Sequence, residues 1–296
     1  MFDDFKHAFQ RYNNAHVQLI IINVVIFLVI GVMSVVGNWT GTEWFADAVY
    51  NQFSIPPVLG EFLTRPWTLV TYMFAHSRWD ISHILFNMLA LYWFGSLFAE
   101  YLGSDKLVAM YVLGGLAGAL VYLFMFNTVP FYVERSLDFP GMVGASAAIY
   151  AIVVGAATLL PDYTFFLMFI GPVRIKYIAA FYVIVSFLGT TQANAGGNLA
   201  HLGGALMGFI YIKQLQRGNN LGSWVTFFIQ WVRNLFAPRR NVKVTYRKET
   251  SSGKKSNKAS AISQAEIDAI LDKISDGGYE SLTKEEKEKL FNASKK

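Results

Sequence analysis

Six apolar runs lie within the first 215 residues of this 296-residue chain, and each is close to the length needed to cross a membrane. A helix needs roughly 20 apolar residues to cross about 30 Å of hydrocarbon. Within lipid, only helices and closed barrels satisfy all of their backbone hydrogen bonds. The sequence therefore predicts an all-α polytopic membrane protein built as a bundle of six transmembrane helices. The expected spans are 17–36, 81–102, 106–126, 144–160, 175–190 and 198–215.

The composition agrees with this fold class, since 54% of the residues are hydrophobic and only 15% are charged. The chain has no cysteine, which excludes disulfides and thiolate chemistry. The net charge of +5 comes from basic residues gathered in the last third, so it does not indicate a nucleic-acid-binding face. We expect the lipid bilayer as a partner, no nucleic acid and no cofactor.

Two of the runs need a separate interpretation. The first follows a polar stretch with Lys6 and Arg11 and lacks a small-x-small cleavage site, so we expect a retained span rather than a signal peptide. The fourth is short and ends at Pro161, which favours a place inside the bundle with its first turn in a water-filled cavity. The loop 37–80 contains an apolar part, 67–74, that is too short to cross and is expected at the interface.

The basic residues predict the orientation, because short cytoplasmic loops carry an excess of Lys and Arg. Placing both termini in the cytoplasm puts most of these residues and the basic tail on the inner face. Ser146 and His201 then both fall near the outer ends of their spans. The inner residues are Lys6, Arg11, Lys106, Arg174 and Lys176, and the outer ones are Arg65, Arg78 and Arg135.

The composition changes twice after the sixth span. Apolar residues at helical spacing over 224–236 predict an amphipathic helix on the inner leaflet, followed by Arg239 and Arg240 and a Lys/Ser-rich linker. The patterns Ser263-x-x-Glu266 and Thr283-x-x-Glu286 then predict two short capped helices. This hairpin could dock a cytoplasmic partner. The expected division is 1–16, a cytoplasmic segment; 17–216, the six-span core; 217–260, the interfacial helix and linker; and 261–296, the hairpin.

Ser146 and His201 are the residues that most strongly suggest chemistry. A histidine within a membrane span is costly unless it has a partner or water. A serine hydroxyl becomes a nucleophile when a base takes its proton, and imidazole suits that task at neutral pH. No carboxylate lies near either residue in sequence, which favours a Ser-His dyad over a triad. Tyr150, one turn after Ser146, is placed to pack on the imidazole, and the Ser146 N–H can donate to an oxyanion.

Small residues on both spans predict that these two helices approach closely. They recur every fourth residue beside Ser146 and beside His201. Ordinary helix packing would give the same stripes, so their coincidence with the two polar residues carries the argument. The stripes are Ala147, Ala151 and Gly155 on the fourth span, and Ala200, Gly204 and Gly208 on the sixth.

His83 and Asn87 form a second polar pair near the outer end of the second span. They are four residues apart, so on a helix they share a face. Both can donate a hydrogen bond to a developing oxyanion. The alternative is structural: the two side chains hydrogen-bond to each other and fasten this span to the outer loop.

Taken together, these motifs resemble the rhomboid family of intramembrane serine proteases over roughly residues 60–212. The stretch Pro66-Trp67-Thr68 is similar to the family's entry to its outer-loop helix. The other matching motifs are Gly144-Ala145-Ser146, Ala200-His201-x-x-Gly204-x-x-x-Gly208 and His83-x-x-x-Asn87.

The resemblance implies a six-span rhomboid-like bundle with Ser146 as nucleophile and His201 as base. It assigns His83, Asn87 and the Ser146 amide to the oxyanion site. Gly144, Gly204, Gly208 and Tyr150 support these residues. It also implies a serine-type endopeptidase that cleaves transmembrane protein substrates, in a bacterial cytoplasmic (inner) membrane.

Two departures from the family pattern stand out. Ala147 follows the nucleophile where the family often has glycine, and its methyl group could narrow the oxyanion site. His76 precedes His83 by seven residues instead of about five, which leaves the role of His76 open.

Other functions fit the sequence less well. Zinc chemistry would suit His-Glu-x-x-His, and aspartyl chemistry would need paired aspartates inside the spans; neither pattern occurs. A transporter would predict inverted repeats and ionisable residues at mid-membrane. A catalytically silent relative that binds membrane clients is the nearest alternative, although such a protein would be expected to lose the serine or the histidine.

Overall fold

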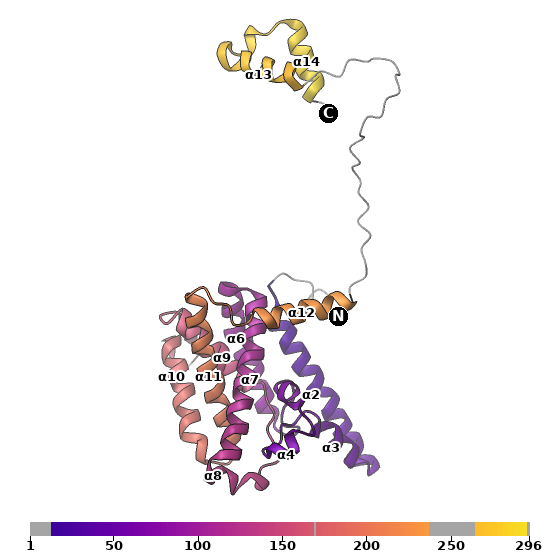
Figure 1. The fold of residues 1–296 in the computed structure, drawn as a ribbon, viewed down its shortest axis with the longest axis vertical. Helices are drawn as coiled ribbons and strands as arrows, with labels where there is room; N and C mark the ends of the chain where they lie inside the picture. Colours follow the sequence, from indigo (N-terminus) through magenta and orange to yellow (C-terminus); the bar gives the residue numbers. More distant parts are fainter. Residues whose placement is uncertain (1–12, 169, 237–263, 295–296) are drawn as a thin grey trace. The chain divides into compact units, whose positions relative to one another are not determined.

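The computed structural model describes residues 13–168, 170–236 and 264–294, and the chain divides into two units, Met1–Pro238 and Arg239–Lys296. The first unit is a helical bundle and the second is a small helical hairpin (Figure 1). Lys6, Arg11, Arg239, Arg240, the Lys/Ser-rich linker and the first predicted cap at Ser263 lie outside the described residues.

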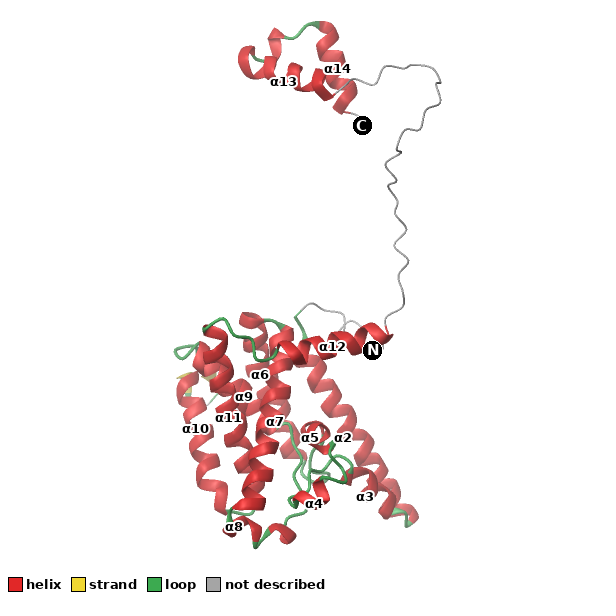
Figure 2. Ribbon diagram, in the orientation of Figure 1, coloured by secondary structure: helices red, strands yellow, loops and turns green. Residues whose placement is uncertain are grey.

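Six helices of the bundle match the six predicted spans, which confirms the predicted fold class (Figure 2). By length and composition, α2, α6 and α7 could each cross a membrane, and α9 and α10 are shorter apolar helices. The sixth, α11, has 22 residues but carries more polar side chains. The six are α2 (Ala15–Thr40), α6 (Ile81–Leu102), α7 (Ser104–Thr128), α9 (Ser146–Leu159), α10 (Ile175–Leu188) and α11 (Ala195–Gln216).

Shorter elements fill the connections. One pair was not predicted: β1 (Thr164–Leu167) and β2 (Gly171–Arg174) pair antiparallel between α9 and α10, with Thr164 opposite Arg174. In the loop after α2, the apolar part of the sequence becomes a helical turn and a 3-10 turn whose Tyr72 and Met73 are buried. The other short elements are α3 (Glu43–Asn51), α4 (Leu59–Phe62), α5 (Thr68–Thr71), η1 (Tyr72–Phe74), α8 (Pro130–Val133), η2 (Ser136–Asp138) and η3 (Gly189–Thr191).

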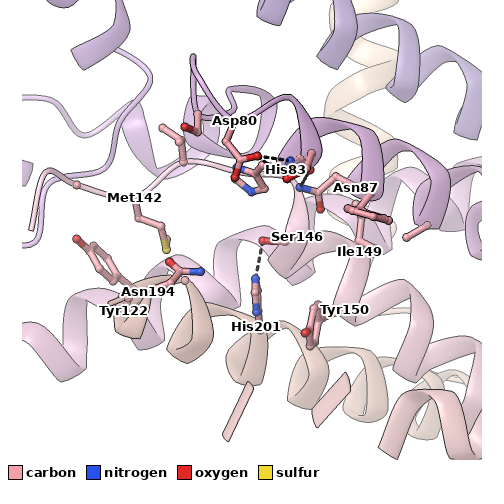
Figure 3. Close-up of a pocket in the computed structure, with 18 of the residues that line it drawn as sticks. Asp80, His83, Asn87, Tyr122, Met142, Ser146, Ile149, Tyr150, Asn194 and His201 are labelled. Atoms are coloured by element: carbon pink, nitrogen blue, oxygen red, sulfur yellow. Dashed lines mark hydrogen bonds between the residues drawn. The ribbon is translucent and has the colours of Figure 1, made fainter. Parts of the chain in front are cut away.

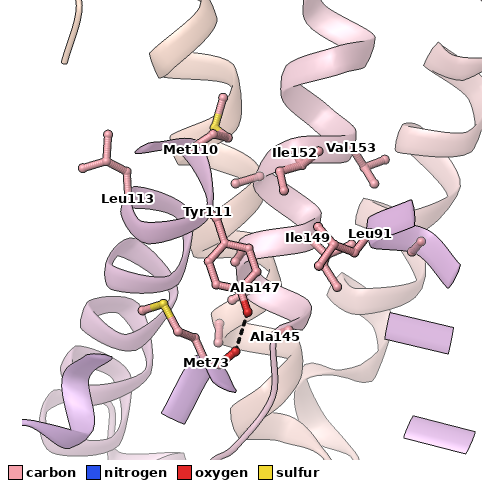
Figure 4. Close-up of a cluster of buried hydrophobic side chains, with 14 of the residues drawn as sticks. Met73, Leu91, Met110, Tyr111, Leu113, Ala145, Ala147, Ile149, Ile152 and Val153 are labelled. Atoms are coloured by element: carbon pink, nitrogen blue, oxygen red, sulfur yellow. Dashed lines mark hydrogen bonds between the residues drawn. The ribbon is translucent and has the colours of Figure 1, made fainter. Parts of the chain in front are cut away.

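The short helix α9 lies at the centre of the bundle, packed against α6, α7, α10 and α11. Its small and branched side chains belong to the main buried cluster, together with Leu91 and Tyr111 of the neighbouring helices (Figure 4). Because protein surrounds α9, a helix of 14 residues suffices here. Outward-facing side chains such as Leu28 and Val32 on α2 and Phe181 on α10 are apolar and exposed, as a surface in lipid requires.

Glycines on α11 allow this packing. A Cβ atom on Gly204 would lie 2.8 Å from the carbonyl carbon of Ala147 and closer still to its oxygen, and one on Gly208 would lie 2.9 Å from that of Ala151. On α7, a Cβ on Gly118 would lie 2.6 Å from the Cβ of Ala147. The predicted small-residue stripes therefore do bring helix backbones together.

The helix α12 (Ser223–Phe236) follows α11 within the first unit. It contacts α7, and Val225 at its start is buried. Several large apolar side chains of α12 are more than half exposed within the described chain, although the Phe228 and Trp231 rings stack on each other. The exposed side chains are Trp224, Phe227, Phe228, Trp231 and Leu235.

The second unit consists of α13 (Gln264–Gly277), η4 (Tyr279–Ser281) and α14 (Lys284–Ser294). The predicted cap at the start of α14 is present: the Thr283 N–H donates to Glu286 Oε2 at 2.8 Å, and the Glu286 N–H donates to Thr283 Oγ1 at 3.3 Å. The bond from Thr283 and a hydrogen bond from Lys273 lower the pKa of Glu286 to about 2. The hairpin core is small, with Ile270 and Leu282 buried.

The packing predicts that Gly204→Ala destabilises the bundle, because its methyl group would meet the Ala147 backbone, which cannot move without displacing α9. Overpacking of this kind costs about 1–3 kcal/mol, which a thermal unfolding assay in detergent detects. Gly31→Ala on α2 is the matched control, since no atom lies within 4 Å of a Cβ there. Equal melting temperatures for the two variants would contradict this account of the α9–α11 contact.

Candidate active site

The structure brings Ser146 and His201 into hydrogen-bonding contact. Ser146 is the first residue of α9, and His201 lies in the second turn of α11. The distance from Ser146 Oγ to His201 Nε2 is 2.6 Å (Figure 3). This is the geometry that a serine nucleophile and an imidazole base require.

Tyr150 lies against the imidazole, as the sequence predicted. Its ring and that of His201 are stacked, with centroids 4.2 Å apart and planes 12° apart. The stack restrains the tilt of the imidazole. It leaves the edge that carries Nε2 directed at Ser146 (Figure 3).

Sequence reasoning missed Ser186, a buried residue in the last turn of α10. Its Oγ lies 3.1 Å from His201 Nδ1 and 2.8 Å from the Tyr150 hydroxyl. The available signal was weak: Ser186 is the only serine or threonine in α10.

His83 and Asn87 lie on α6 and line the same cavity as the serine and the histidine (Figure 3). The Asn87 Nδ2 atom donates to the His83 carbonyl at 2.9 Å, a bond within α6. It therefore does not fasten α6 to the outer loop, as the structural alternative required. An amide nitrogen carries two hydrogens, so this bond uses one of the two donors.

Gly144 explains how the His83 ring comes close to the serine. A Cβ at this position would lie 3.0 Å from His83 Nε2 and 3.5 Å from Ser146 Oγ, and the Gly144 φ of 138° disfavours any residue with a side chain. Asp80 caps α6 by accepting the His83 N–H at 3.1 Å. Hydrogen bonds from the Ser82 hydroxyl and the His83 N–H lower the pKa of the Asp80 carboxyl, so it stays ionised at the rim.

The cavity has a volume of about 940 Å³. The dyad and the α6 pair form part of its wall, and the rest includes residues of α7, of α11 and of the connections that precede α9 and α11. Among these are Tyr122, Phe139, Met142, Asn194 and Gly197. A space of this size admits an extended peptide segment.

His76 lies behind the site rather than in it. It is buried, its ring centroid is 5.1 Å from that of His83, and neither ring nitrogen has a hydrogen-bond partner among the described residues. The same described residues hold no cluster of three or more His, Asp or Glu side chains suited to a metal ion.

The fold and the site define the class of protein: a helical membrane protein with a Ser-His pair beside an internal cavity. Comparisons with known proteins identify the family. The Rhomboid domain matches residues 63–217. This is more than half of the chain, and the protein belongs to the rhomboid family. A second family, of unknown function (DUF6576), matches residues 253–296.

Individual relatives of this chain also carry rhomboid names. The mitochondrial RHOMBOID-like protein 12 of Arabidopsis thaliana is 34% identical over 163 residues, covering 52% of this chain and 48% of the relative. The mitochondrial Rhomboid protein 1 of Saccharomyces cerevisiae is 29% identical, covering 51% and 42%. Rhomboid protease GlpG of Salmonella choleraesuis is 29% identical, covering 45% and 40%. The chain thus spans about half the length of the curated relatives it matches.

Proposed function

We propose that this rhomboid is an intramembrane serine endopeptidase that cuts transmembrane segments of other membrane proteins with a Ser146–His201 dyad. The observation that carries the proposal is the 2.6 Å contact between Ser146 Oγ and His201 Nε2 in a cavity large enough for a peptide. A relative at 29% identity, GlpG, is named a protease.

The chemistry follows from the geometry. His201 Nε2 accepts the Ser146 proton as Oγ attacks the scissile carbonyl, and a tetrahedral oxyanion forms. His201 then gives that proton to the leaving amine, and an acyl-enzyme remains on Ser146. A water molecule, deprotonated by the same imidazole, attacks the ester and releases the second product. The imidazolium then gives the proton taken from water to the departing Ser146 Oγ, so His201 is neutral again at the end of acylation and at the end of deacylation.

The oxyanion needs donors where its charge develops. The Ser146 N–H is at the start of α9, where the helix dipole favours negative charge. His83 and Asn87 line the same cavity, and the bond to the His83 carbonyl uses only one of the two Asn87 amide hydrogens. The three groups act on the transition state more than on the bound substrate.

The substrate class follows from how a peptide carbonyl can reach Ser146. A helical segment has its carbonyls bonded within the helix, so only a locally unwound segment presents one to Ser146. Transmembrane segments with small or helix-breaking residues meet this need. The competing proposal, a silent protein that binds membrane clients, gives no reason for a short Ser-His hydrogen bond in the cavity.

The dyad predicts that Ser146→Ala and His201→Ala each abolish cleavage of a reporter protein carrying a transmembrane segment. The double variant should be no less active than either single one, because the two residues act as a unit. Thermal unfolding in detergent verifies that the variants fold. Cleavage by folded Ser146→Ala would refute the protease assignment.

The oxyanion assignment predicts that His83→Ala and Asn87→Ala each lower kcat about 10²-fold or more, the size expected for the loss of one donor. KM should change far less, since the bond strengthens only in the transition state. Steady-state kinetics in lipid measures both. Parent kcat values in both variants would reduce His83 and Asn87 to structural residues.

The orientation proposed is that of a multi-pass protein of the bacterial inner membrane with both termini in the cytoplasm. The exposed aromatic face of α12 then lies in the inner leaflet. A seventh span is disfavoured because α12 has 14 residues and contains Arg233. Two of the relatives are named mitochondrial and chloroplastic.

The absence of cysteine makes this orientation testable with single introduced cysteines. In intact cells, a membrane-impermeant maleimide should label Leu137→Cys, an exposed site between α7 and α9, and should label Tyr279→Cys in the hairpin only after lysis. Labelling of Tyr279→Cys in intact cells would reverse the proposed topology.

A further inference from the structure

A single oxygen atom joins three helices behind the dyad. Ser186 Oγ on α10 contacts His201 Nδ1 on α11 at 3.1 Å and the Tyr150 hydroxyl on α9 at 2.8 Å. The Ser186 side chain is fully buried. Its partners are the two residues whose rings stack against each other at the site.

The hydrogen of the Ser186 hydroxyl goes to another helix, unlike those of two other hydroxyl residues in the predicted spans. Ser34 donates to the Ile30 carbonyl at 2.9 Å, and Thr158 donates to the Val154 carbonyl at 2.7 Å, each four residues back in its own helix. That is the usual arrangement for a hydroxyl in an apolar helix. Ser186 instead bonds to side chains of two other helices, so its hydroxyl acts outside its own helix.

The direction of the bond from Ser186 to Tyr150 determines the directions of the other two bonds. The Ser186 hydroxyl has one hydrogen, which it donates to the Tyr150 oxygen. Its oxygen is then an acceptor toward His201, so His201 Nδ1 carries the hydrogen. A neutral imidazole has one N–H, so Nε2 is left with a free lone pair, which receives the Ser146 hydroxyl hydrogen at 2.6 Å.

We infer that Ser186 is a positioning residue that holds His201 in the Nδ1–H tautomer and fixes its ring for proton transfer from Ser146. The inference rests on the proposed function. A catalytic triad uses a carboxylate to orient its imidazole. In this dyad, the neutral Ser186 hydroxyl has that role. When the imidazolium forms, the Nδ1–H···Oγ bond becomes charge-assisted and stronger.

A purely structural role is the competing explanation, because the same bonds also fasten α10 to α9 and α11. The two roles differ in what they predict. If Ser186 only fastens the helices to one another, its loss affects stability and substrate binding. A positioning residue affects the His201 tautomer and kcat.

The test compares Ser186→Ala, Ser186→Thr and the matched control Thr158→Val, which removes a hydroxyl that does not touch the dyad. The full-length variants are studied in lipid bilayers with a cleavable transmembrane reporter. Steady-state kinetics gives kcat and KM. Solid-state NMR with ¹⁵N-labelled histidine gives the tautomer, and His201→Ala identifies the His201 signals by their loss.

We expect Ser186→Ala to lower kcat about tenfold, the effect of one lost orienting hydrogen bond, with KM unchanged. The His201 spectrum should change from one tautomer to a mixture with the Nε2–H form. Ser186→Thr should restore most of kcat and the single tautomer, and Thr158→Val should match the parent.

An unchanged tautomer in Ser186→Ala would overturn the inference, whether kcat falls or not. A rise in KM and a loss of thermal stability with kcat unchanged would assign Ser186 a structural role. Failure of the proposed function is distinguishable, because cleavage by Ser146→Ala refutes the protease while the tautomer measurement still reports on the Ser186 bond.

Discussion

The contact between α9 and α11 governs the geometry of this protein. Gly204 and Gly208 lie directly against the backbone carbonyls of Ala147 and Ala151, a separation that no larger residue permits. Because Ser146 is one residue before Ala147 and His201 is one turn before Gly204, this backbone contact also brings the two side chains to 2.6 Å. Helix packing and the candidate chemistry therefore rest on the same small residues.

The membrane shapes the site in a second way. Protein surrounds α9 on several sides, so this helix can be short and can begin at a cavity instead of at the membrane surface. A hydroxyl and an imidazole can then meet within the bundle beside a cavity. Gly144 allows the chain to enter α9 beside the His83 ring, and Ser186 closes the back of the imidazole. The polar groups around the dyad come from α6, α9, α10 and α11.

Much of the fold and of the candidate site was predictable from the sequence. In a membrane, long apolar runs and small residues at every fourth position are compatible with only a few structures. The six helices, the facing stripes and the stacking of Tyr150 on His201 all follow from spacing. The β1–β2 pair and the role of Ser186 could not be predicted from spacing. A four-residue strand carries little periodicity, and a lone serine in an apolar helix does not reveal whether its hydroxyl bonds to its own backbone or to another helix. The Asn87 bond to the His83 carbonyl likewise depends on a rotamer that the sequence does not specify.

The central claim is that His201 activates Ser146 as a nucleophile, and intact-protein mass spectrometry after treatment with a fluorophosphonate in bilayers tests it most directly. Such reagents modify serines whose proton is removed by a neighbouring base. The account predicts one adduct, located on Ser146 by peptide mapping, and its loss in His201→Ala. Absence of the Ser146 adduct in the parent protein, or equal labelling of the parent and His201→Ala, would contradict it.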